Sequence, residues 1–75
     1  MISLTEMPAG KKGTIVTIYG GHGLIQKLNT LGLRIGKEIV KVSGQWMKGP
    51  VIIRSGNTEI AIGFGMAHKI MVETK

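Results

Sequence analysis

The sequence contains no cysteine and no aspartate, and only three of its 75 residues are aromatic. Without cysteine the chain has neither a disulfide nor a thiolate metal site. No window approaches the roughly 18 apolar residues of a membrane-spanning helix, and the first residues lack the charged start and apolar run of a signal peptide. We therefore expect one cytoplasmic domain over residues 1–75, held together by an aliphatic core.

Acidic residues are scarce, since four glutamates stand against ten lysines and arginines and leave a formal net charge of +6. Such an excess favours acidic partners, whether nucleic acid, an anionic membrane surface or an acidic protein face. The cations are scattered along the chain, so solubility explains them as well. No two carboxylates are close in sequence, and no serine lies beside a histidine that could act as its base. We expect a binding protein and not an enzyme.

Glycine is abundant, with 12 residues, and it separates short runs rich in β-branched side chains. This pattern is typical of a small barrel built from short, sharply turning strands. We expect a mainly β fold, an SH3-like barrel of about five strands with a helical turn near 63–67. The expected strands are 14–19, 37–43, 51–54, 58–62 and 68–73. Before the first of them, a turn over residues 4–10 is expected to place Leu4 and Met7 on the core.

One segment has the spacing of a helix. Leu24, Ile25, Leu28 and Leu31 lie on one helical face, which predicts a short α-helix over about 22–31. Gly32 is placed to end this helix in the left-handed conformation, with the next leucine folding back onto the last turn as in a Schellman motif. A helix this short is not stable alone, so it must lie across the sheet or close one end of the barrel.

The order of glycines and apolar residues along the whole chain resembles that of the FeoA domain. The residues that carry the resemblance are Leu4, Met7, Gly10, Gly13 and Ile15 at the start, Leu28, Leu31-Gly32-Leu33 and Gly36 in the middle, Gly49-Pro50, Gly56 and Ile60-Ala61-Ile62 in the later hairpin, and Ala67, Ile70 and Val72 near the end. Two positions depart from the family pattern. Ile35 stands where the family often has proline, and Gly63 stands where it often has a basic residue.

This resemblance implies a small SH3-like barrel with an accessory role in ferrous iron uptake. FeoA proteins are accessory to FeoB, a membrane ferrous-iron transporter with a cytosolic GTP-binding domain. The expected partner is therefore the cytosolic part of such a transporter, and the expected effect is on its assembly, GTPase or transport activity. Association with the membrane would come only through this partner.

Two alternative functions remain open. A similar domain forms the C-terminal part of some iron- and manganese-responsive repressors, so the chain is alternatively a stand-alone relative of that domain. The other alternative is a basic SH3-like barrel that binds nucleic acid. The shortage of aromatic side chains for base stacking makes nucleic acid less favoured than the transporter as a partner, although this alternative ranks ahead of the repressor relative.

The family also raises the question of a transition metal. His22 and His68 are the weak candidates for ligands, but no two histidine or glutamate residues have the spacing that places them together on one helix face. We expect these histidines to be surface or structural residues and expect no cofactor. Iron bound at His22 and His68 is the alternative.

The segment between 44 and 50 carries the sharpest candidates for partner contact, which are Trp46, Met47 and Lys48. Tryptophan is enriched among interface hot spots, and the flanking glycines favour an exposed loop. The alternative is that Trp46 folds over the end of the barrel as a lid on the core.

A second set of candidates is basic. Its members are Arg34, Lys37, Lys41, Lys48 and Arg54 around the second and third expected strands, and Lys11 and Lys12 in an earlier loop. Together they predict a basic face that meets an acidic partner surface. The expected state of the chain alone is a monomer or a weak dimer, because exposed strand edges permit pairing.

Overall fold

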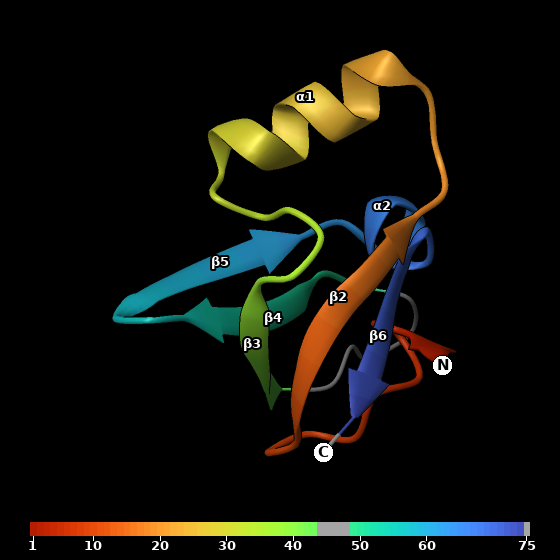
Figure 1. Ribbon diagram of the computed structural model, residues 1–75. Helices are drawn as coiled ribbons and strands as arrows, with labels where there is room; N and C mark the ends of the chain where they lie inside the picture. Colours follow the sequence, from red (N-terminus) through yellow and green to blue (C-terminus); the bar gives the residue numbers. More distant parts are fainter. Residues whose placement is uncertain (44–48, 75) are drawn as a thin grey trace.

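The computed structural model describes residues 1–43 and 49–74 (Figure 1). This part of the chain forms one antiparallel sheet, in the order β1-β6-β2-β3-β4-β5, and two short helices. The elements are β1 (Ile2–Ser3), β2 (Lys12–Ile18), α1 (His22–Thr30), β3 (Glu38–Ser43), β4 (Val51–Ser55), β5 (Thr58–Ile62), α2 (Phe64–Ala67) and β6 (Ile70–Thr74).

The prediction of a mainly β fold is confirmed. The five expected strands are β2 to β6, with ends that differ by no more than two residues, and the expected helix and helical turn are α1 and α2. The sequence analysis missed β1, which has only two residues. This strand forms by pairing with β6, where Ile2 lies opposite Val72. The two residues are at opposite ends of the sequence, so a local pattern cannot predict their contact.

The core is a single cluster of aliphatic side chains. The strands supply alternate residues, because successive side chains of a strand point to opposite faces. The buried hydrophobic residues of the described chain are Leu4, Met7, Ile15, Leu28, Leu33, Ile39, Val51, Ile53, Ile62, Ala67, Ile70 and Val72. The expected placement of Leu4 and Met7 on the core is thus confirmed.

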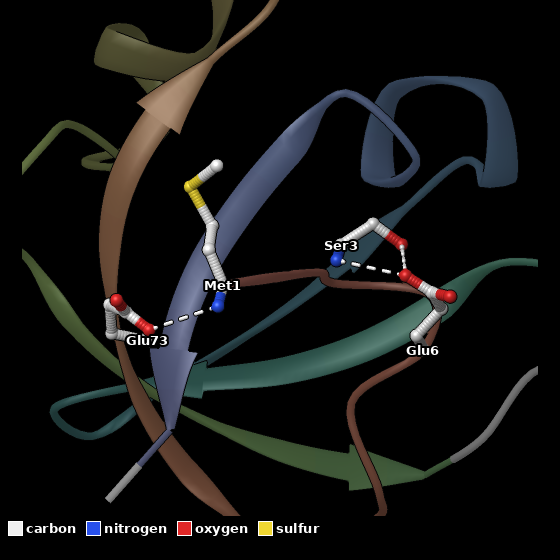
Figure 2. A network of polar contacts seen from close by, with 4 residues as sticks. All are labelled: Met1, Ser3, Glu6 and Glu73. Atoms are coloured by element: carbon white, nitrogen blue, oxygen red, sulfur yellow. Dashed lines mark hydrogen bonds and ion pairs between the residues drawn. The ribbon is translucent and has the colours of Figure 1, made fainter.

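A hydrogen-bonded turn after β1 brings Leu4 inward. The backbone N–H and the hydroxyl of Ser3 donate to Oε1 of Glu6 at 3.2 and 3.3 Å, as Figure 2 shows. The N–H of Glu6 in turn donates to the carbonyl of Ser3 at 3.0 Å. The glutamate reaches back three residues as it does in a helix capping box, although no helix follows here. In the same view the terminal amine of Met1 lies 3.2 Å from Oε2 of Glu73, which ties β1 to β6.

The end of α1 has the geometry that the sequence predicts. Gly32 has a φ of 85°, and its N–H donates to the carbonyl of Asn29 at 2.9 Å. The N–H of Leu33 donates to the carbonyl of Leu28 at 2.8 Å, and both leucine side chains are buried. These two bonds and the paired leucines form a Schellman motif, and the prediction is confirmed.

The helix lies at one end of the sheet, beyond the end of β2 (Figure 1). Among the described residues of α1, Leu28 alone is buried, with Leu24 partly buried against the core. A Cβ atom on Gly20 would lie 2.5 Å from Cδ2 of Leu24, so glycine at this position lets the helix fold back closely onto the preceding chain. The result is a helix held by a few apolar contacts, with much of its surface exposed.

Candidate functional site

Two of the predicted basic residues, Lys12 and Arg54, lie on the outer face of the sheet. Lys12 pairs with Val40 across β2 and β3, Val40 pairs with Arg54, and Arg54 pairs with Glu59 on β5. Residues directly opposite one another in an antiparallel ladder share a face, so these four side chains form one row across the sheet. We call this face the sheet row.

Carboxylates stand among the cations of the sheet row. Nη2 of Arg54 lies 2.6 Å from Oε2 of Glu59, in a pair that is about half exposed. On the same face, Thr14 of β2 lies between Glu38 of β3 and Glu73 of β6. Strand pairing thus places side chains of opposite charge beside one another on this face. The sheet row is therefore not the basic face that the sequence predicts.

Lys41 does not belong to any exposed face. Only 2% of this residue is accessible to solvent, and it pairs with Ile53 on the inner side of the sheet. Its Nζ donates to the carbonyls of Leu4 and Thr5, each at 3.1 Å. Burial lowers the pKa of Lys41 below its ordinary value. The expectation that Lys41 contacts a partner is wrong, because β3 turns Ile39 and Lys41 inward and its two valines outward.

The remaining candidates are either exposed residues of the described chain or residues that lie outside it. Lys11 is exposed in the turn before β2, His22 is exposed as the first residue of α1, and His68 is exposed directly after α2. The ring of His68 stacks on Phe64, with centroids 6.1 Å apart. The described residues contain no group of three or more histidine, cysteine, aspartate or glutamate side chains that could hold a metal ion. Trp46, Met47 and Lys48 lie outside the described residues.

A hollow lies on the side of α1. It has a volume of about 280 Å³, and Ile18, Ile25, Asn29, Arg34 and Ile35 line it. Ile18 comes from the end of β2, Ile25 and Asn29 come from α1, and the other two come from the segment after the helix. Ile25 is 36% exposed and Ile35 is 64% exposed, so large apolar side chains face solvent here. We call this feature the α1 groove.

The backbone fixes the wall of the α1 groove that Arg34 and Ile35 form. The N–H of Lys37 donates to the carbonyl of Arg34 at 3.1 Å, across a turn in which Gly36 has a φ of 94°. Gly36 then donates to the carbonyl of Ile15 at 2.7 Å, and Ile15 donates to the carbonyl of Lys37 at 3.0 Å. Figure 1 shows this segment passing back beneath α1 towards β3. The groove is therefore built on β2 and not on a free loop.

The stretch of chain that forms most of the α1 groove carries charge of one sign. Residues 19–37 include Lys27, Arg34 and Lys37, all exposed, and contain no carboxylate; the next residue, Glu38, begins β3 and lies opposite Thr14 on the face of the sheet row. The sequence analysis named Arg34 and Lys37 as candidates but missed the exposed isoleucines beside them. The predicted apolar face of α1 is covered only in part, since Leu28 is buried and Leu24 partly buried, whereas Ile25 and Leu31 are 36% and 40% exposed.

The family model of the FeoA domain matches residues 2–74. A protein of Methanocaldococcus jannaschii named "Putative Fe(2+) transport protein A" is 38% identical over 73 residues, which cover 97% of this chain and 87% of that protein. The chain belongs to the FeoA family. Its sequence resemblance to that family is thus confirmed.

Solved FeoA structures have the same fold. The crystal structure of an iron uptake regulatory protein (FeoA) has a TM-score of 0.87 and 40% identity, covering 99% of this chain and 96% of that one. FeoA from Chlorobium tepidum has a TM-score of 0.86 and 18% identity, over 97% of this chain and 70% of that one. The expected SH3-like fold is confirmed by these neighbours.

The same fold also occurs within a longer protein. The manganese regulator SloR has a TM-score of 0.86 and 16% identity, and the match covers 99% of this chain but 34% of SloR. At this identity the likeness concerns the fold alone. The described helices of this FeoA chain are all too short or too polar to cross a membrane.

Proposed function

We propose that this FeoA chain is an accessory protein of ferrous iron uptake that binds the cytosolic part of a FeoB-type transporter. Membership of the FeoA family supports the accessory role in ferrous iron transport. Binding the transporter is the finer step, and with it comes an effect on transporter assembly, GTP hydrolysis or transport. In this proposal the chain works in the cytoplasm, by contact and without chemistry of its own.

The surface of the chain supports the proposal in addition to its family membership. The family match extends over residues 2–74, so nearly all of this sequence is a FeoA domain. What such a small domain offers a partner is its surface. Here that surface combines a net charge of +6 with exposed isoleucines on the side of α1. A protein face with carboxylates and an apolar residue complements both features.

The direct experiment measures binding between the purified chain and the purified cytosolic GTP-binding domain of a FeoB-type transporter. We expect a complex whose affinity falls as salt is raised, because part of the attraction is between opposite charges. GTP hydrolysis by the transporter domain, followed with and without the chain, would show the direction of the effect.

Nucleic acid provides the comparison in the same assay. Generic RNA that binds more tightly than the transporter domain, with a steep dependence on salt, would favour the alternative function. Absence of a complex with the transporter domain at low salt would contradict the proposal.

A further inference from the structure

We propose that the α1 groove is the docking site for an acidic protein segment that inserts one apolar side chain between α1 and the Arg34–Ile35 wall. This inference rests on the proposed function in one respect, that the cytosolic part of the transporter supplies the segment. The lining and charge of the groove determine the chemistry of the segment.

The size of the α1 groove suits a side chain. Its volume of about 280 Å³ is far larger than the roughly 30 Å³ that one water occupies. It is also at the lower limit of the about 300–1,000 Å³ that small-molecule sites occupy, so a whole cofactor would fit poorly. Three isoleucines supply most of the lining, and the amide of Asn29 offers a donor and an acceptor at the wall. An aliphatic or aromatic side chain attached to a peptide backbone matches this arrangement.

The charge of the groove selects the sequence around that side chain. Arg34 lines the groove itself, and Lys27 and Lys37 are exposed on the same stretch of chain, in which no carboxylate is present. In the sheet row, by contrast, Arg54 is already paired with Glu59. No carboxylate of this stretch balances the cations at the groove. Carboxylates of a docked segment can therefore pair with them.

Two other occupants fit less well. A second copy of this chain would bring another net charge of +6 to a positive surface, which costs association energy. An anionic membrane attracts the same charge, but amphipathic surfaces that enter a bilayer present a broad apolar face of tryptophan, phenylalanine or leucine. Here Ile18, Ile25 and Ile35 surround a hollow, which receives a side chain better than a flat surface does.

The first experiment tests the chemistry without the transporter. The labelled full chain is titrated in an NMR experiment with a short synthetic peptide that has one leucine flanked by glutamates, and with the same peptide carrying serine in place of leucine. We expect resonance changes centred on Ile25, Asn29 and Ile35, and affinity for the serine peptide lower by about tenfold or more. Equal response to both peptides, or changes centred on Lys12 and Arg54, would overturn the inference.

Vesicles of phosphatidylglycerol are the second probe. Binding of the chain to these vesicles that is lost in Ile35→Asp, together with no response to the leucine peptide, would assign the α1 groove to lipid and overturn the protein segment. If Ile35→Asp binds the vesicles as well as the wild type does, the attraction to lipid comes from net charge and not from the α1 groove. Lipid is then excluded as the occupant of the groove, and the peptide titration tests the protein segment.

The second experiment uses the transporter domain and four variants at exposed positions. Arg34→Glu and Ile35→Asp alter the groove, whereas Lys12→Glu and Thr58→Asp introduce the same carboxylates on the sheet. We expect the Kd to rise about tenfold or more for the two groove variants and to stay close to the wild-type value for the sheet variants. Circular dichroism and thermal melting confirm that each variant is folded.

The outcomes separate the two claims. If the wild type binds the transporter domain and all four variants bind equally well, the docking site is elsewhere and the proposed function stands. If the wild type does not bind that domain but the leucine peptide occupies the groove, the partner is wrong and the chemistry of the groove stands.

Discussion

The sheet row and the α1 groove are both surfaces with cations, but they differ in what lies beside the charges. In the sheet row, Lys12 and Arg54 share a face with three glutamates contributed by other strands. At the α1 groove, Arg34 lines the same hollow as three isoleucines, and residues 19–37, which form most of it, contain no carboxylate. A basic residue thus indicates a surface that can bind an acidic partner only where no nearby carboxylate already pairs with it.

The difference has a simple origin. A sheet places residues from distant parts of the sequence opposite one another, so the charge of its face is set by register. The groove is formed mostly by one continuous stretch, from the end of β2 through α1 to Lys37, so its charge can be counted along the chain.

Replacing Lys41 gives the largest effect. Lys41→Ala removes a buried side chain and the donor to the carbonyls of Leu4 and Thr5, so we expect the free energy of unfolding to fall by about 2–4 kcal/mol. Lys41→Met keeps most of the volume and should lose less. Urea denaturation measures both. An alanine variant as stable as the wild type would mean that Lys41 behaves as a surface lysine, and the sheet would then have a further cation to offer an acidic partner.

The same lysine predicts a dependence on pH. Burial lowers its pKa below the ordinary value of 10.5, so between the lowered pKa and 10.5 the unfolded chain binds more protons at this site than the folded chain does. The contribution of Lys41 to the free energy of unfolding therefore rises as pH increases through that window. The difference in unfolding free energy between the wild type and Lys41→Met, measured at several alkaline pH values, isolates this site. A difference that stays constant, or falls, contradicts the prediction.

The next effect concerns the groove side. Gly32→Ala places a Cβ on a residue with a φ of 85°, which costs about 1–2 kcal/mol in the left-handed region. Because Gly32 ends α1 and sets the course of the chain towards Arg34, we also expect weaker binding of the leucine peptide. Thermal melting and the peptide titration give the two readouts. Gly21→Ala, where an added Cβ meets nothing within 4 Å and the φ is −77°, is the matched control. Lost stability with unchanged peptide binding would show that the helix end does not shape the groove.

The smallest effect belongs to the sheet row. A double-mutant cycle on Arg54→Ala and Glu59→Ala should give a coupling of about 0.2–1 kcal/mol, because both side chains are about half exposed and water screens their attraction. The coupling should shrink as salt is raised. A coupling of zero at low salt would mean that the carboxylate does not balance Arg54, and the sheet row would then be as available to an acidic partner as the groove is.

Much of the fold could be predicted from local pattern. Five of the strands, both helices and the Schellman ending of α1 follow from β-branched runs, helical spacing and the place of Gly32. Strand β1 could not be predicted, because two residues carry no alternation and form a strand only by pairing with β6. The orientation of β3 was equally undetermined, since both Ile39 with Lys41 and Val40 with Val42 are alternating pairs.

For the candidate site, the sequence by itself determined that the chain is a small, positively charged FeoA domain and that Arg34 and Lys37 are basic residues near its second long strand. Composition and the order of glycines and apolar residues are enough for that, because they are properties of the chain itself. Only the tertiary structure decided that Lys41 is buried, that Arg54 is paired with Glu59, and that Ile18, Ile25 and Ile35 meet around one hollow. All three depend on contacts between elements: strand register sets them for Lys41 and for Arg54 with Glu59, and the path of the chain around α1 sets them for the three isoleucines.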